Sequence, residues 1–225
     1  MIHILLSRGI LGSELVHKYA KTYIKSDMKV LIVALSFFEQ QFKDASEYNL
    51  FYGPGGEYYE KMVGSFIPYG IPEKHIDFLN YYKDDQNDAL KKIQKADIIY
   101  FPGGAPDLMM KRIKALGIEE ALLKKTFFIG SSAGAMIQFQ TYHISKDYDY
   151  KKFSYEEGLN LIKGYGIEVH YRRKKVQKSA MRKVHRAYKI PIITLPDDGC
   201  IIDHDGQLKL IGTAKLYYDE KGVIS

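Results

Sequence analysis

FFIGSSAGAMIQF, residues 127–139, joins a β-rich apolar run to an apolar helical pattern through a short series of small residues. The first three residues predict the end of a buried strand, and residues 133–137 predict the start of a helix. Ser132 then lies at a strand-to-helix turn, in the middle of a Gly-x-Ser-x-Gly pattern. An ordinary tight turn also has this composition, so other parts of the chain must show whether the turn exposes a hydroxyl.

The small residues around Ser132 suit a turn built for catalysis. A sharp turn places the serine in a strained backbone conformation, and side chains two residues before and after it would clash. The helix that follows supplies free backbone N–H groups and a partial positive charge at its N-terminus. We therefore predict that Ser132 is a nucleophile, that the Ala133 N–H faces a developing oxyanion, and that Ser131 points away.

Short apolar runs alternate with helical patterns through most of the chain. The predicted strands are residues 2–6, 30–35, 98–101 and 126–129, and the predicted helices are residues 11–24, 40–63, 85–95 and 106–123. This alternation predicts an α/β fold with three layers, in which a mostly parallel sheet carries helices on both faces. Turn signals separate four later runs and predict a small antiparallel C-terminal ending: residues 192–195, 199–203, 208–211 and 215–218. No linker or repeat interrupts the pattern, so we expect residues 1–225 to form one domain.

A second glycine turn, Pro102-Gly103-Gly104, follows the predicted strand that precedes the Ser132 strand. The carboxyl ends of parallel strands share one edge of the sheet. If the two strands are neighbours, the Gly104 N–H lies beside Ser132 and completes an oxyanion hole with Ala133. An ordinary strand-to-helix turn is the alternative interpretation.

A serine nucleophile needs a base, and His170 is the candidate among seven histidines. Residues 166–171, GIEVHY, alternate between polar and apolar, which predicts a strand with Glu168 and His170 on one face. The acid that orients the imidazole is Asp147 or Glu168, and the sequence leaves both open. Glu168 and His170 also resemble a pair of metal ligands, but no third ligand is evident, so no metal is predicted.

Composition excludes several classes of protein. Hydrophobic residues make up 46% of the chain, which allows a sizeable core, and no apolar run approaches the roughly 20 residues of a membrane helix. The N-terminus lacks the basic region of a signal peptide, and Cys200 is the only cysteine, which together predict a cytoplasmic protein.

The net charge is +6, with much of the excess in residues 171–186. That block is either a solvated helix face or a positive pocket wall for an acidic substrate, and no nucleic-acid recognition motif accompanies it.

Three segments of the chain resemble the serine peptidase family of dipeptidase E (aspartyl dipeptidase) and cyanophycinase. They are the glycine turn 101–104 followed by Leu108, the turn 130–135, and residues 158–162 followed by 168–171. The resemblance implies a class I glutamine amidotransferase-like (flavodoxin-like) fold and hydrolysis of small, acidic peptides. It implies no cofactor and no nucleic-acid or membrane partner, and it leaves a homodimer open.

The resemblance also implies roles for individual residues. Asp147 stands where the family has an acidic residue of the proposed triad, and Arg172 and Arg173 are the candidates to hold a substrate carboxylate. The chain departs from the family pattern at Asn160, at Val169 and in the packed residues 172–175, which bears on the substrate more than on the chemistry.

Three other functions are alternatives for a chain with this turn. Amidotransferases of the same fold use cysteine at the turn, where this chain has serine, so glutamine hydrolysis is not expected. An esterase of the α/β-hydrolase kind would use His204 with Asp197 or Asp198. A catalytically inactive binding homologue would retain the turn without turnover.

Overall fold

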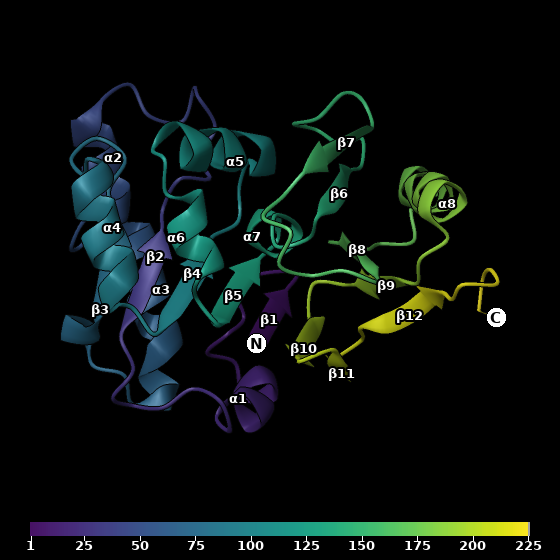
Figure 1. The fold of residues 1–225 in the computed structure, drawn as a ribbon, viewed down its shortest axis with the longest axis horizontal. Coiled ribbons are helices and arrows are strands. Elements are labelled where there is room, and N and C mark those ends of the chain that lie inside the picture. The colour runs from purple at the N-terminus through teal and green to yellow at the C-terminus, as the bar shows by residue number, and fades with distance from the viewer. Residues whose placement is uncertain (225) are drawn as a thin grey trace.

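The computed structural model describes residues 1–224 and confirms the predicted α/β class (Figure 1). The strands are β1 (Ile2–Leu6), β2 (Val30–Val33), β3 (Ile76–Leu79), β4 (Ile98–Phe101), β5 (Phe127–Ser131), β6 (Thr141–Ile144), β7 (Ser154–Glu157), β8 (Gly166–Val169), β9 (Ile192–Leu195), β10 (Cys200–His204), β11 (Gln207–Ile211) and β12 (Lys215–Tyr218). The α-helices are α1 (Glu14–Ala20), α2 (Ala45–Tyr52), α3 (Glu57–Phe66), α4 (Gln86–Lys95), α5 (Pro106–Ala115), α6 (Glu119–Leu123), α7 (Ala133–Met136) and α8 (Lys175–Tyr188).

The central sheet has seven strands in the order β11-β10-β1-β5-β4-β2-β3. The five strands from β1 to β3 in this order are parallel, so their carboxyl ends meet at one edge. The register pairs Leu6 with Ser131 and Phe101 with Gly130. The turns after β1, β4 and β5 therefore come together, and β4 and β5 are neighbours, which is the condition that the oxyanion-hole prediction required.

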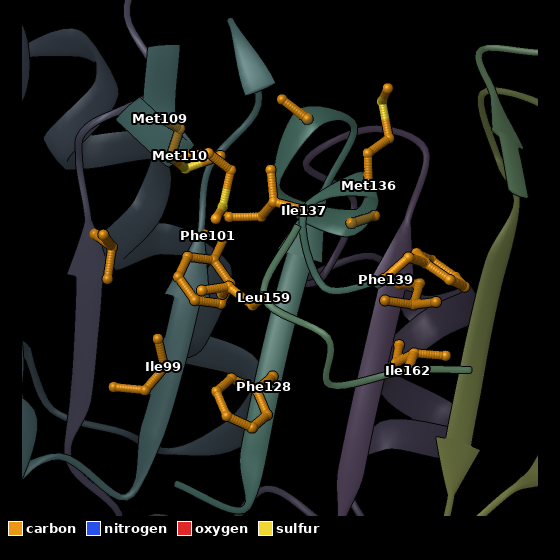
Figure 2. Packing of buried hydrophobic residues seen from close by; sticks show 14 of the residues in the cluster. Ile99, Phe101, Met109, Met110, Phe128, Met136, Ile137, Phe139, Leu159 and Ile162 are labelled. Carbon is orange, nitrogen blue, oxygen red and sulfur yellow. The ribbon is translucent and has the colours of Figure 1, made fainter. Parts of the chain in front are cut away.

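Alternate residues of the central strands pack into two separate hydrophobic clusters, one on each face of the sheet. One cluster joins the sheet to α4, α5, α6 and α7, and the other joins it to α1 and α3. Figure 2 shows part of the first cluster, in which Phe101 of β4 and Phe128 of β5 lie below Met109, Met110 and Ile137. The strand-to-helix turn at Ser132, called the elbow below, is therefore continuous with helix α7, whose residues pack directly against the core.

A smaller sheet, in the order β12-β9-β8, lies beside the central sheet and carries α8 at the far end of the molecule from α2 and α4 (Figure 1). The hydrophobic cluster under α5 continues into it through Ile167, Ile193 and Leu195. The predicted C-terminal ending is antiparallel but divided between the sheets. β10 and β11 extend the central sheet next to β1, while β12 pairs with β9, which is itself parallel to β8.

Several predicted boundaries differ from the structure for local reasons. The expected helix 40–63 is two helices, because residues 53–56, Gly-Pro-Gly-Gly, break it. The expected helix 106–123 is divided into α5 and α6, because Gly117 between them has a φ of +68°, a left-handed conformation. The expected helix 11–24 is reduced to α1, whose N-cap is Ser13. Strand β3 and the hairpin of β6 and β7 were not predicted.

Candidate active site

Ser132 lies between β5 and α7 with φ +50° and ψ −113°, a strained conformation for a residue with a side chain. Its backbone N–H donates to the carbonyl of Leu6 at 2.8 Å, which ties the turn to the end of β1. The Ser132 side chain is half-buried, while the neighbouring Ser131 is buried at the end of β5. The backbone of the turn therefore leaves the Ser132 hydroxyl as the accessible one of the two.

The two glycines that flank the serine pair are required by close packing. A Cβ at Gly134 would overlap the carbonyl oxygen of Phe101, and a Cβ at Gly130 would overlap both the Gly134 carbonyl and the Gln138 side chain. These are backbone and buried atoms in a closely packed region, so moving them aside would cost free energy of folding. The small residues of the motif are thus explained by contact with β4 and α7.

The buried side chains of His3 and Gln138 form a hydrogen-bonded pair that supports the turn. Gln138, fully buried just after α7, donates from Nε2 to the Gly134 carbonyl at 3.0 Å. Its Oε1 lies 2.9 Å from Nδ1 of His3, which is buried in β1, so the imidazole carries its proton on Nδ1 and donates. Burial lowers the pKa of His3 and keeps its ring neutral, which suits a donor and acceptor pair of this kind. Neither residue was recognised from the sequence.

The structure brings His170 to Ser132. The His170 Nε2 lies 2.8 Å from the Ser132 Oγ, which is hydrogen-bond distance for an imidazole that accepts the hydroxyl proton. His170 follows the last residue of β8 and has φ +50°, so the alternation expected for residues 166–171 stops before it. Its backbone N–H donates to Oγ of Ser7, a fully buried residue at the end of β1.

The loop that carries His170 is held mainly by side chains. Gln177 of α8 donates from Nε2 to the His170 carbonyl at 3.0 Å, and its Oε1 accepts the Arg172 N–H at 2.9 Å. The Tyr171 N–H donates to the Leu195 carbonyl of β9. The start of α8 is therefore attached directly to the residue that contacts Ser132.

The acid closest to the imidazole is Asp197, in the turn after β9. Its Oδ1 lies 3.3 Å from Nδ1 of His170. The same carboxylate contacts Arg8 Nε and Arg172 Nη2, each at 2.9 Å. The Arg8 guanidinium, followed by His170 and Arg172, holds the pKa of Asp197 far below its usual range, so the carboxylate is ionised at any ordinary pH.

Neither acid that the sequence favoured contacts His170. Asp147 accepts the backbone N–H groups of Asp149 and Tyr150 and thereby forms a turn after β6. Glu168 is buried and lies 2.6 Å from Nε2 of His143, and it accepts the Ser145 hydroxyl at 3.0 Å. Asp197 entered the sequence prediction only as a partner of His204, because a Pro-Asp-Asp-Gly turn gives no local sign of which imidazole it will meet.

The two residues predicted as oxyanion donors, Gly104 and Ala133, lie in or next to the turns around Ser132. An added Cβ at Gly103 would come within 3.4 Å of Ser132 Cβ, so the Gly103-Gly104 turn is adjacent to the elbow. Gly104 has φ +139°, and a side chain there would overlap the Ser36 carbonyl. Ala133, as the first residue of α7, has an N–H without an intrahelical acceptor. In residues 1–224 no backbone carbonyl accepts either N–H.

A cavity of about 660 Å³ opens above these groups. Ser132, His170, Gly104 and Ala133 line it, as do Asp147 and Glu168. Arg172 also lines it but is engaged with Asp197, and Arg173 lies outside it, facing a second cavity with Pro196 and Thr213. The cavity-lining cations without an ion pair in the described chain are the exposed Lys146 and Lys174.

His204, the base of the esterase hypothesis, lies at the opposite end of the strands from Ser132. The register of β10 pairs it with Ile2, whereas Ser131 pairs with Leu6, so roughly 13 Å of strand separates the two ends. His204 contacts Asp205 and Tyr23 instead.

Within residues 1–224, no cluster of three or more His, Cys, Asp or Glu side chains is placed to hold a metal ion. The helices of the described chain include none with the length and apolarity to cross a membrane.

Comparison with known proteins gives a family and a fold. The family model described as "Peptidase family S51" matches residues 34–211. A protein assigned as a peptidase E from Listeria monocytogenes EGD-e has a similar structure, with a TM-score of 0.66, 17% identity, and coverage of 93% of this chain and 96% of that chain. A peptidase from an acI-B1 Actinobacterium matches with a TM-score of 0.65, 14% identity, and coverage of 96% and 89%. No curated protein matches the sequence. At these identities the two structures establish the fold alone.

Proposed function

Because the chain belongs to peptidase family S51, we propose that it is a serine-type peptidase that hydrolyses short peptides through an acyl-enzyme. Family membership supports the serine peptidase class. The observation that carries the proposal is the 2.8 Å approach of His170 Nε2 to the Ser132 hydroxyl, on a strained turn that opens into a cavity.

In the proposed mechanism, the Asp197 carboxylate accepts the Nδ1–H of His170 and so leaves Nε2 as the base. His170 takes the Ser132 proton while Oγ bonds to the scissile carbonyl carbon. His170 then gives that proton to the departing amine as the carbon–nitrogen bond breaks. A water molecule then gives a proton to the same imidazole as its oxygen bonds to the acyl carbon. The bond to Ser132 Oγ breaks, His170 returns the proton to Oγ, and the acid product leaves.

In this proposal, two backbone N–H groups stabilise the negative charge that develops on the carbonyl oxygen. We assign this role to the N–H groups of Gly104 and Ala133, because both residues line the cavity beside Ser132 and no backbone carbonyl in residues 1–224 accepts either N–H. Donors fixed in advance in a partly dry site stabilise such a charge strongly, and the loss of one typically costs about 10²–10³ in rate.

We further propose that the substrate carries an acidic residue, for example aspartate at its N-terminus. The candidate cations are Lys146 and Lys174, because Arg172 is committed to Asp197 and Arg173 lies outside the cavity. Lysine offers a point charge without the bidentate geometry of arginine. A panel of Asp-x, Glu-x and Leu-x dipeptides tests this preference, and equal cleavage of Asp-x and Leu-x would exclude it.

The proposed function predicts that Ser132→Ala abolishes hydrolysis and labelling by a fluorophosphonate probe. The substitution removes only the attacking oxygen, so the thermal unfolding midpoint should change little. Ser131→Ala is the matched control, because that neighbouring hydroxyl is buried and should leave labelling intact. A folded wild-type protein that neither reacts with the probe nor cleaves peptides would indicate a binding protein instead.

A further inference from the structure

The segment between Glu168 and Asp197 has a charge distribution that the proposed catalytic step does not use. It contains no acidic residue, and its lysines and arginines are Arg172, Arg173, Lys174, Lys175, Lys178, Arg182, Lys183, Arg186 and Lys189. Within residues 1–224, Arg172 is the one member that forms an ion pair. The positive charge of this segment is therefore balanced by solvent rather than by the protein itself.

Four of these cations form a single row along α8. Lys175, Lys178, Arg182 and Arg186 are spaced by three, four and four residues, which places them within an arc of about 80° at about 100° per residue. All but Lys178 are exposed, and Lys178 is half-buried. The buried residues Ala180 and Val184 lie on the opposite side of the helix, and the buried His185 borders the row next to Lys178. We call these four residues the α8 cation row.

The start of α8, next to the first residue of the row, lies at the candidate active site. Lys174, the N-cap of α8, and Val176 line the same cavity as Ser132, and Gln177 holds the His170 carbonyl. A helix of 14 residues is about 21 Å long, the span of about six residues of extended peptide. A chain whose reactive bond lies at Ser132 can therefore continue along the row without leaving the protein surface.

We propose that the α8 cation row binds an acidic segment of the substrate polypeptide, on the C-terminal side of the bond cleaved at Ser132. The proposal rests on the proposed function, and it changes the expected substrate from a dipeptide to a longer acidic chain. Cations in a row complement carboxylates spaced along an extended peptide, and they raise the rate of encounter at low ionic strength.

Two other anionic partners fit the surface less well. A helix that lies on a membrane inserts its apolar face, and the apolar face of α8 is buried in the protein. A surface that binds single-stranded nucleic acid combines its cations with aromatic side chains for stacking. The row holds no aromatic residue, and Tyr188 at the end of α8 packs against Tyr155.

The test compares binding of two fluorescein-labelled peptides, Asp-Leu-(Glu)6 and Asp-Leu-(Gln)6, to the Ser132→Ala protein. At low salt the glutamate peptide should bind at least tenfold more tightly. Adding K178Q/R182Q/R186Q should reduce its affinity about tenfold, as three surface ion pairs predict, with little change in the glutamine peptide. A control triple substitution at exposed lysines elsewhere, K21Q/K25Q/K124Q, should change the affinity less than twofold. At about 1 M salt, where the screening length is roughly 3 Å, the preference should disappear.

Kinetics of the otherwise wild-type enzyme separate this inference from the proposed function. Both peptides hydrolysed at equal kcat/KM, together with equal binding, would overturn the inference and leave the function standing. No hydrolysis of either peptide, with binding as expected, would leave the α8 site standing and remove the function. An RNA 12-mer or phosphatidylserine vesicles that bind more tightly than the glutamate peptide, and lose binding in the α8 triple variant, would overturn the inference in favour of that partner.

Discussion

The two reacting side chains of the proposed site are held in different ways. Ser132 is fixed by backbone packing, because its turn is wedged between β4, β5 and α7 with no room for a Cβ at Gly130 or Gly134. His170 lies just past a strand end and is held by the side chains of Ser7, Gln177 and Asp197. We therefore expect substitutions of the glycines that flank the serine pair to affect folding, whereas substitutions around His170 should affect rate.

The largest effect should come from Gly134→Ala. Its Cβ would overlap the Phe101 carbonyl, and the change should lower the free energy of unfolding by about 3 kcal/mol or prevent folding. Gly64→Ala is the matched control, since its Cβ meets nothing within 4 Å in α3 and should be neutral or slightly stabilising. Chemical denaturation measures both, and a stable, fully active Gly134→Ala protein would contradict the rigid description of the elbow.

Asp197→Asn should act on rate and leave the fold intact. The amide no longer favours the His170 tautomer with its proton on Nδ1, so we expect kcat to fall by about 10³-fold or more. The adjacent Asp198→Asn, which alters a contact with Thr213, should cost less than tenfold. If Asp147→Asn or Glu168→Gln reduces kcat more than Asp197→Asn does, the acid is one of the two that the sequence first favoured.

Ser7→Ala tests a smaller contribution to the position of the base. Without the hydroxyl that accepts the His170 N–H, the loop should lose one buried hydrogen bond worth about 1 kcal/mol, and kcat should fall roughly tenfold. Ser65→Ala removes a comparable buried hydroxyl, bonded to the Lys61 carbonyl, and should lower stability similarly without an effect on kcat. Equal kcat in the two variants would show that Ser7 does not position the base.

The smallest effect concerns Arg8 and pH. The lowered pKa of Asp197 contributes stability that is present above its unfolded pKa of about 3.9 and is lost as pH falls toward the folded value. Arg8→Gln should bring that pKa closer to normal and lower stability at pH 7 by under about 1 kcal/mol, since the carboxylate is 40% exposed. The difference between the two proteins should shrink below about pH 4, and a difference that grows with acidity would contradict the assignment.

The sequence predicted the local part of this site and missed the distant part. The Ser132 turn and the Gly104 turn follow from short patterns, because strand, turn and helix are adjacent in the chain, whereas the pairing of β4 with β5 was only a condition of the prediction. Ser7 and Asp197 contact His170, and Arg8 contacts Asp197, from the turns after β1 and β9, and nothing within their own segments indicates these contacts. The expected alternation of Glu168 and His170 failed because the strand ends at Val169 and the next residue adopts a left-handed conformation.

The contact between Ser7 and His170 joins residues 163 positions apart, and Arg8 pairs with a residue still further along the chain. Synthesis must therefore pass Asp197 before the base can be anchored, although β1, β4, β5 and the Ser132 turn are complete much earlier. Catalytic activity would then be the last property that the folding chain acquires. Probes of the nucleophile alone would detect a folded turn before the enzyme is active.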